Sequence, residues 1–537
     1  MKSKMNLLTA GFASVLFLGI GAQAADLENL IEGSTASDAP QVAAAVTQTR
    51  LSTAVSSLFK KMTPDQNVFL RNIEKQDWKK ALISWGPAFN ATPFERTENA
   101  KALQALIMFK TGLEITGVEK LFTAQNVKSI HPEIIQTWKE SLNDNHPVWE
   151  VAQIKWNDGW SNVFGRSTEV RSKLRSVDLK TNVGLLKEMA SRLPANTKER
   201  ALVDWQLALS YAMNDKSDEA AKIIGQLLKN DKSPYGEDLI NLTAGRLLFQ
   251  SGFFEAATKY YEKIEKKSDY WLEAQEELAW TYLRKGETQN AIAVSKSLMN
   301  SAFESYLGPE PYFVESLGQL KVCDYPKVME GLTQFPKRFK SRTVELNKLA
   351  QGEKSEFINS VLNKLKTEKM SWSVLGKDIQ FLPRAMVKDF KLVQLMESQK
   401  LYEKEAKVSD QLYADALALT GIQGSFQSMK NGLTEKNGKV KSAQIQRIKE
   451  LAKGEVAEIK RILDKLHIVE AELVSQVEVS DKIIKNGTGL DSELKKGTTG
   501  SKKSDSLVFV ADSNEVWFDE ISNYKVDVKK GCQGVKK

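Results

Sequence analysis

The side chains that most often carry out chemistry in proteins are sparse in this sequence of 537 residues. Its three histidines, His131, His146 and His467, are far apart and have no cysteine or carboxylate companions at the spacing of metal ligands. Residues 497–504, Gly-Thr-Thr-Gly-Ser-Lys-Lys-Ser, have the composition of a phosphate-binding loop, but no glycine immediately precedes the lysine and no strand leads into the segment. We therefore expect no enzyme activity, no metal and no cofactor.

The only two cysteines are Cys323 and Cys532. Export to an oxidising compartment would permit a disulfide between them. The bond would close a loop of about 208 residues and stabilise the fold by on the order of 5 kcal/mol at most. The alternative is a pair of unrelated thiols, with Cys323 filling a contact between helices.

Residues 1–24 have the pattern of a secretory signal. Lys2 and Lys4 give a positive start, residues 7–20 are apolar, and Ala-Gln-Ala at 22–24 is a small-residue cleavage site. No other segment approaches the roughly 20 apolar residues of a spanning helix. We expect export to the periplasm without an integral membrane span or a lipid anchor; an uncleaved N-terminal anchor is the alternative.

The charge of the chain excludes one class of partner. The formal net charge is +8, and the loss of the two lysines of the signal lowers it to +6, with acids and bases interspersed throughout. Nucleic-acid binding needs Lys and Arg gathered on one face, and no basic tract stands out. We expect no nucleic-acid partner and only weak attraction to anionic polymers of the cell wall.

A pair of small residues 12 positions apart recurs along the middle of the chain. Gly245 and Ala257 form one pair, and Ala279 and Ala291 form the next. Two helices cross closely only where neither carries a bulky side chain, so each pair predicts two packed antiparallel helices. The same interval recurs upstream and downstream in two further pairs, Ala208 with Ala220 and Ser316 with Val328.

The predicted turn glycines of two units, Gly252 and Gly286, are 34 residues apart, which is the period of stacked helix-turn-helix repeats. The segments Gly-Phe-Phe-Glu-Ala-Ala-Thr-Lys-Tyr-Tyr at 252–261 and Leu-Ala-Trp-Thr-Tyr-Leu-Arg-Lys-Gly at 278–286 resemble the tetratricopeptide repeat (TPR) family. The resemblance implies an all-α solenoid whose concave groove binds extended peptides or partner helices.

The resemblance also implies which residues line that groove, because the first helix of each unit faces it at fixed offsets from its small residue. The selected side chains are aromatic, apolar or charged: Trp205, Arg246, Phe249, Glu276, Trp280 and Leu283. Such a set suits the anchoring of a protein partner. The alternative is that Trp280 and Phe249 pack against the neighbouring unit.

Four tryptophans occur between residues 138 and 160, and three of them, Trp149, Trp156 and Trp160, follow intervals of 7 and 4. This spacing predicts one face of a helix. Core packing is the favoured interpretation, since indoles bury a large area. A platform for sugar rings of cell-wall glycan is the alternative.

The C-terminal part of the chain has the pattern of two long amphipathic helices. One apolar series runs from Leu392 to Ala416, a glycine-bearing stretch follows at 421–438, and a second series runs from Ile445 to Ile483 with a 3-4 spacing. We expect an antiparallel coiled-coil hairpin whose second arm projects about 60 Å. An intermolecular coiled coil is the alternative. The polar exceptions in the second seam are Glu455, Gln476 and Ser480.

The last residues change composition twice. Gly, Ser, Thr and Lys at 486–506 indicate a linker, and β-branched and aromatic residues at 507–537 indicate a small β-hairpin that docks on the helical body. The expected organisation is a signal peptide at 1–24, a flexible leader at 25–63, degenerate helical repeats at 64–199, TPR-like repeats at 200–342, a helical connector at 343–383, the helical hairpin at 384–485, the linker at 486–506 and the β-hairpin tail at 507–537.

These features predict a non-catalytic exported scaffold that binds protein partners of the cell envelope through the groove and the projecting hairpin. Two alternatives remain: a structural component of an envelope machine for motility or wall remodelling, and a binder of cell-wall glycan through the face of Trp149.

Overall fold

The computed structural model describes residues 50–485 except 176, 301–302, 304, 367, 369 and 417–422. Over these residues the chain is all-α and contains no strand, and none of its helices has the length and apolar composition needed to cross a membrane. The predicted signal peptide at 1–24, the linker at 486–506 and the β-hairpin at 507–537 lie outside the described residues.

The N-terminal region consists of short helices around an aromatic core. Helix α3 begins with a capping box, in which the Thr63 side chain accepts from the Gln66 backbone N–H and the Gln66 side chain accepts from that of Thr63. Ala81 and Val118 are fully buried in the second helices of two packed pairs, α3–α4 and α5–α6. The elements are α3 Pro64–Glu74, α4 Trp78–Phe89, η4 Pro93–Arg96, α5 Glu98–Thr111, α6 Glu114–Leu121, η5 Val127–Ser129, α7 Pro132–Ser141, α8 Val148–Val151, α9 Asp158–Phe164, α10 Arg166–Leu174 and α11 Val183–Ser191.

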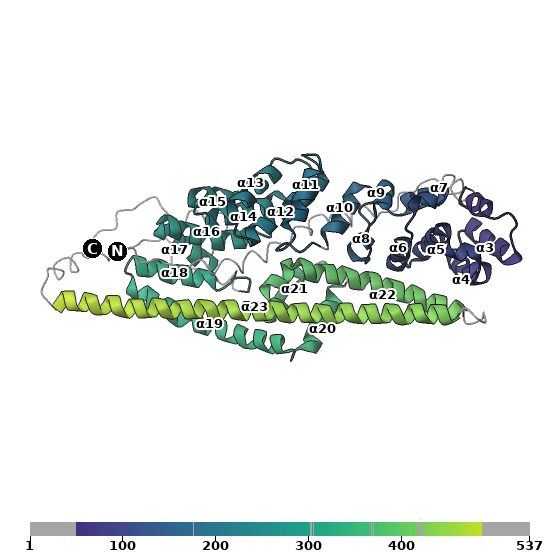
Figure 1. Cartoon of the computed structure of the whole chain (residues 1–537). Helices are drawn as coiled ribbons and strands as arrows, with labels where there is room; N and C mark the ends of the chain where they lie inside the picture. Colours follow the sequence, from purple (N-terminus) through teal and green to yellow (C-terminus); the bar gives the residue numbers. More distant parts are fainter. Residues whose placement is uncertain are drawn as a thin grey trace.

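The middle region is an array of helices in which each packs against the next along the chain (Figure 1). The array is repeat-like because its helices pair in the order that the small residues predict. Its last helix, α19, runs past residue 342, where the sequence predicted the end of the repeats. The helices are α12 Lys198–Met213, α13 Ser217–Leu227, α14 Glu237–Gln250, α15 Phe254–Tyr261, α16 Trp271–Lys285, α17 Thr288–Leu298, α18 Glu310–Lys321 and α19 Tyr325–Gln351.

The close helix crossing predicted from Gly245 and Ala257 is present. Helices α14 and α15 pack together, and a Cβ atom at Gly245 would lie 2.6 Å from Cε1 of the Tyr261 ring. A side chain larger than hydrogen therefore does not fit without displacing a fully buried aromatic ring. The turn that follows α14 contains Gly252 with φ of 82°, a left-handed conformation that glycine adopts at little cost.

The C-terminal helices form an antiparallel pair. Arg447 contacts Asp389, just before α22, at 2.6 Å, and Lys430 contacts Asp410, near the end of α22, at 2.9 Å. The later residue of α23 thus meets the earlier residue of the α22 segment, so the two helices run in opposite directions. The elements of this region are α20 Ser355–Lys364, α21 Trp372–Leu375, η7 Gly376–Phe381, η8 Arg384–Lys388, α22 Phe390–Ala416 and α23 Gln423–Lys485.

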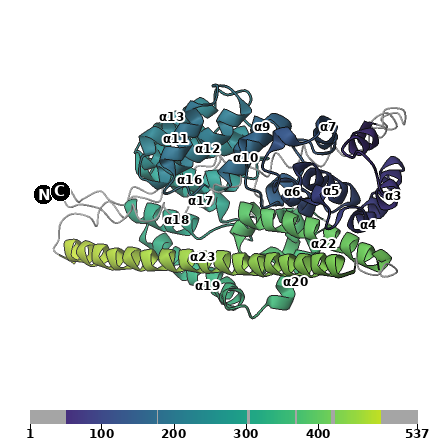
Figure 2. The same ribbon diagram turned by 45° about the vertical axis from the view of Figure 1, so that its right-hand side comes forward.

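The helical pair does not project from the body as the sequence suggested. Helix α22 packs against α4, α6 and α8 of the N-terminal region, and α23 packs against α18 and α19 of the array. Figures 1 and 2 show α23 running along the length of the molecule beside both regions. The sequence predicted that the apolar face of α23 packs only against α22. It also packs against the repeats, because Ile459, Ile462 and Leu466 belong to the same buried cluster as residues of α16 and α18.

Two other expectations about helices are wrong. The glycine-bearing stretch does not separate the two long helices throughout, since α23 already begins at Gln423 and continues through Gly432 and Gly438. Trp149 and Trp160 do not share one helix. They belong to α8 and α9, because Ala152 is extended and the Asn157 side chain accepts from the Gly159 N–H to start a new helix.

The tryptophan cluster is nevertheless core, as the favoured interpretation held. The Phe122 ring lies at the centre, with centroid distances of 6.1 Å to Trp149, 5.1 Å to Trp156 and 5.4 Å to Trp160. Trp160 is fully buried and Trp149 nearly so, and Trp156 is half-buried. The indole faces that would stack on a sugar ring are thus largely occupied by other aromatic rings of the chain.

Helix α22 is fixed to the N-terminal region through one buried carboxylate. Glu405 accepts hydrogen bonds from the backbone N–H groups of Ile115 and Thr116 and, at 2.8 Å, from the Thr116 hydroxyl. These N–H groups belong to the first turn of α6 and have no partner within that helix. Burial raises the pKa of Glu405 to about 7, although the hydrogen bonds oppose the shift.

The Glu405 carboxyl predicts a pH dependence of stability. Between the usual glutamate pKa of 4.5 and about 7, the folded chain holds a proton that the unfolded chain has lost. The free energy of unfolding should therefore fall as the pH rises through this window, by roughly 2–3 kcal/mol in all. Glu405→Gln should remove this slope in denaturant titrations from pH 4.5 to 8. Glu403→Gln is the control, since Glu403 lies on the same helix with a lowered pKa; an unchanged slope in Glu405→Gln would contradict the assignment.

Substitution of glycine by alanine should have opposite effects on stability at open positions of α23 and at the close crossing of α14 and α15. A Cβ atom at Gly432 or Gly438 meets nothing within 4 Å. Alanine at either position should raise the free energy of unfolding by about 0.5–1 kcal/mol, because it removes the entropic cost of glycine in a helix. Gly245→Ala should lower it, since the new methyl group collides with the Tyr261 ring. Thermal and denaturant unfolding measure both, and a stabilising Gly245→Ala would refute the close crossing of α14 and α15.

Candidate functional site

The side chains predicted to line a groove are buried inside the chain. Trp205 is 1% exposed and stacks on Tyr235 with ring centroids 4.6 Å apart. Phe249 packs edge-on against Phe254 at 5.3 Å, and Leu283 is 3% exposed. These three residues hold the array itself together, which is the packing role that the sequence left open for Phe249.

Arg246 and its partners form an ion pair within the array. Its guanidinium donates to Glu277 at 2.8 Å through Nε and at 2.6 Å through Nη2, and it lies 3.3 Å from Glu273. Burial opposes the charge of Arg246, but the two carboxylates outweigh it and raise its pKa. Helices α14 and α16 are therefore joined by charge as well as by apolar packing.

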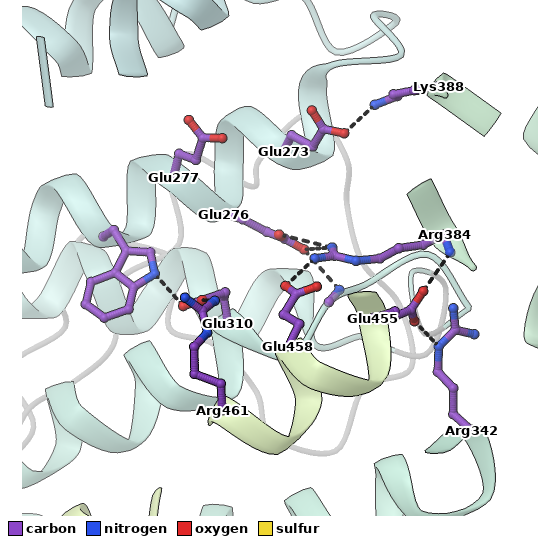
Figure 3. A network of polar contacts seen from close by, with 12 residues as sticks. Glu273, Glu276, Glu277, Glu310, Arg342, Arg384, Lys388, Glu455, Glu458 and Arg461 are labelled. Atoms are coloured by element: carbon purple, nitrogen blue, oxygen red, sulfur yellow. Dashed lines mark hydrogen bonds and ion pairs between the residues drawn. The ribbon is translucent and has the colours of Figure 1, made fainter. Parts of the chain in front are cut away.

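Glu276 reaches beyond the array to the C-terminal elements. Both of its carboxylate oxygens lie 3.3 Å from Nη1 of Arg384, which begins η8. Nη2 of Arg384 donates to Glu458 of α23 at 2.6 Å. One guanidinium thus links α16 to α23, as Figure 3 shows.

A second contact between the array and α23 centres on Glu310 of α18. Glu310 accepts from the Trp280 indole N–H at 2.9 Å and from Arg461 at 2.9 Å. The ammonium group of Lys465 lies 5.8 Å from the Trp280 ring centroid and 5.2 Å from that of Phe313, within the range of cation–π attraction. Trp280 therefore does bind a helix, but the helix belongs to the same chain.

Glu455 completes the contact on the other side. It accepts from Arg342 of α19 at 2.6 Å and from the Arg384 backbone N–H at 2.8 Å. Arg342 also donates to the Leu382 carbonyl at 3.2 Å, and Lys388 pairs with Glu273 at 3.0 Å. The short segment between η7 and α22 is thereby held between α16, α19 and α23.

Together these residues form what we call the charged interface, in which the two signs balance. Its six carboxylates are Glu273, Glu276, Glu277, Glu310, Glu455 and Glu458, and its six cations are Arg246, Arg342, Arg384, Lys388, Arg461 and Lys465. Charges taken out of water are tolerated when they are paired and hydrogen-bonded. Each of the six carboxylates faces at least one cation of the interface, although Oε2 of Glu277 has no hydrogen-bond partner.

The environment shifts the pKa values of the interface in both directions. Burial raises the pKa of Glu276, of Glu310 and of Glu458 despite the nearby cations. Burial also acts on Glu273, but Lys388 and Arg246 outweigh it and lower the pKa. Shifted carboxyl groups are a feature of catalytic sites as well. Here each of them is directed at a cation of the same interface.

One sequence feature indicated that α23 has polar contacts, but it did not indicate their partners. Glu455 was a polar exception in the apolar seam of α23, and in the structure it faces Arg342 and Arg384. Gln476, a second exception, accepts from the Tyr325 hydroxyl at 3.3 Å. Glu458 and Arg461 have no such signature, because charged residues on a long helix are usually solvated, and Arg384 lies in a short element, η8, outside the apolar series.

Cys323 lies in the turn between α18 and α19 and is disulfide-bonded. Its predicted partner, Cys532, is the only other cysteine of the chain and lies outside the described residues. The pairing of these two residues stays a prediction.

No metal-binding group of His, Cys, Asp and Glu side chains occurs within the part of the chain that the structure describes. No protein-family model and no curated protein matches the sequence. The geometry of the charged interface is therefore the main guide to function.

Removing Arg384 tests whether the charged interface holds α23. Arg384→Met leaves Glu276 and Glu458 buried without their cation, and should lower the free energy of unfolding by about 3 kcal/mol. The double variant Arg384→Met/Glu458→Gln should recover part of this loss, because one uncompensated charge is removed. Denaturant titration measures both.

The control for this prediction is an ion pair on the surface. Arg192 and Glu188 are adjacent on one helix turn, with side chains 73% and 55% exposed. Arg192→Met should change the free energy of unfolding by less than about 1 kcal/mol. Equal losses in Arg384→Met and Arg192→Met would show that the interface contributes no more than a surface pair.

Proposed function

We propose that the protein is a non-catalytic, exported scaffold that binds protein partners in the cell envelope, and that its repeats form a TPR-like solenoid packed against the chain's own α23. The observation that carries the proposal is the charged interface. Residues selected as groove-lining anchors, among them Glu276 and Trp280, contact a helix or the segment leading to it. A helix is the kind of ligand that such grooves bind.

The polar groups of the interface support a binding role rather than catalysis. Arg384 is shared between Glu276 and Glu458, and Glu310 between Trp280 and Arg461. A general acid or base must be able to reach a substrate, whereas these groups are committed to each other. Their function in this proposal is to fix one position of α23 along the array.

Helix α23 is best regarded as a permanent part of the scaffold. Ile448, Ala452 and Ile462 are fully buried in the same cluster as residues of α16 and α18. Displacing the helix would expose this apolar surface to water, at a free-energy cost of about 25 cal/mol for each Å² exposed. Envelope partners are therefore expected to bind the outer surface of the assembled body, with α23 in place.

A structural role in an envelope machine is a second candidate, favoured by the length of α23. Its 63 residues correspond to about 95 Å at 1.5 Å per residue. Along this length it joins both buried clusters, with Phe426 and Leu433 in the N-terminal cluster and Ile459 in that of the array. A helix that ties two regions in this way suits a rigid spacer.

Crosslinking in the native cell envelope, followed by identification of the attached proteins, tests the proposed function. The full chain and the Arg192→Met control should capture the same set of envelope proteins. Arg384→Met should lose that set, because partners bind the body only when α23 is held in place. Capture of no protein above an unrelated exported control would refute the scaffold, and full capture by Arg384→Met would show that the charged interface is not required.

A further inference from the structure

The last turns of α23 carry both buried and exposed apolar side chains. Val469 and Leu473 point into the buried cluster shared with the array. Ile468 is 57% exposed, Val474 61% and Val477 38%, and at 3.6 residues per turn these three wind about half-way around the helix. Residues three apart are neighbours on a helix surface, so Ile468, Val474 and Val477, with exposed Ala471 between them, form a continuous row that we call the α23 stripe.

The α23 stripe differs from the other exposed apolar residues of the described chain. Those residues, Val68, Leu185, Phe253, Met329 and Val344, are far from one another in sequence and lie on separate elements or turns. Single exposed apolar side chains are ordinary in proteins, whereas a contiguous row indicates a surface that another segment covers.

The disulfide-bonded cysteine lies beside this end of α23. Cys323 is two positions before Tyr325, whose hydroxyl donates to Gln476 at 3.3 Å. Gln476 is adjacent in sequence to Val477 of the stripe. A segment attached at Cys323 therefore starts within a short reach of the α23 stripe.

We propose that residues 507–528, tethered through a disulfide between Cys323 and Cys532, cover the α23 stripe. This occupant is an intramolecular one and goes beyond the proposed binding of envelope partners. The segment contains apolar residues of matching character in the runs Leu-Val-Phe-Val at 507–510 and Val-Trp-Phe at 516–518. Because Cys532 is the only other cysteine, the tether fixes which part of the sequence comes close.

Chain length and charge agree with this occupant. About 46 residues separate Lys485 from Cys532, a length that spans ~150 Å when extended and so easily allows a return along α23. The exposed Glu470 and Glu472 flank the stripe. Lys525, Lys529 and Lys530 precede Cys532 and carry the opposite charge.

Side-chain footprinting with a carbene label on the full-length oxidised protein tests the proposal, because labelling reports the solvent access of individual side chains. Val474 should be labelled several-fold less than Val344 of α19, which has 46% exposure in the described residues. In the full-length Cys532→Ser variant, labelling of Val474 should rise to the level of Val344. Phe253 is the internal standard and should not change.

The outcomes distinguish the C-terminal segment from an uncovered stripe and from a second copy of the chain. Equal labelling of Val474 and Val344 in the oxidised protein would overturn the proposal, because the stripe would then be uncovered. Protection that persists in Cys532→Ser and depends on protein concentration, with a dimer mass by light scattering, would assign the stripe to a second copy of the chain. Protection that persists in a monomer would exclude the tether as its cause.

A reciprocal variant tests the same contact from the other side. Val474→Glu/Val477→Glu leaves the disulfide intact but places charges where the tail docks, so trypsin should cleave after Lys525 several-fold faster than in the parent protein. Val344→Glu is the matched control and should leave this cleavage unchanged. An unchanged rate in the double variant would overturn the proposal. None of these readouts depends on an envelope partner, so their failure is distinct from failure of the proposed function.

Discussion

The architecture depends on the neutralisation of charge in a place where water has little access. Arg384 sits between Glu276 of the array and Glu458 of α23, two carboxylates whose burial would otherwise be costly. Pairing of this kind adds less to total stability than apolar packing does, but it distinguishes one alignment from its neighbours. A shift of α23 by one turn would separate Glu458 from Arg384 and leave this buried carboxylate without that partner. The apolar seam alone would tolerate such a shift far better.

Local parts of the structure could be predicted from the sequence because their causes are local. The interval from Gly245 to Ala257 predicted a close crossing, and the Tyr261 ring fills the space that a side chain at Gly245 would need. The two apolar series after residue 390 predicted two long helices that pack together. In both cases the determining residues are neighbours along one helix or belong to consecutive helices.

The position of the helical pair could not be predicted in the same way. The apolar face of α23 is consistent with packing on α22, on a second chain or on the array, and nothing in the spacing distinguishes among them. The polar contacts that decide it join residues on different elements and far apart in sequence, 74 positions for Arg384 with Glu458 and 113 for Arg342 with Glu455. Glu455 signalled a polar partner without saying where it was. The predicted groove followed from the resemblance to a repeat family, which carries no information on what fills the groove in this chain.

Helix α23 follows the array in the sequence, so the array is synthesised before the helix that covers it. The surface of the array that α23 covers is translated well before the helix that hides it, and it includes neighbours of Ile459 and Leu466. A chain cut short after residue 416 would contain the helices of the array and yet expose an uncovered apolar side to proteases and chaperones. Burial of this apolar side of the array therefore depends on completion of the chain as far as α23.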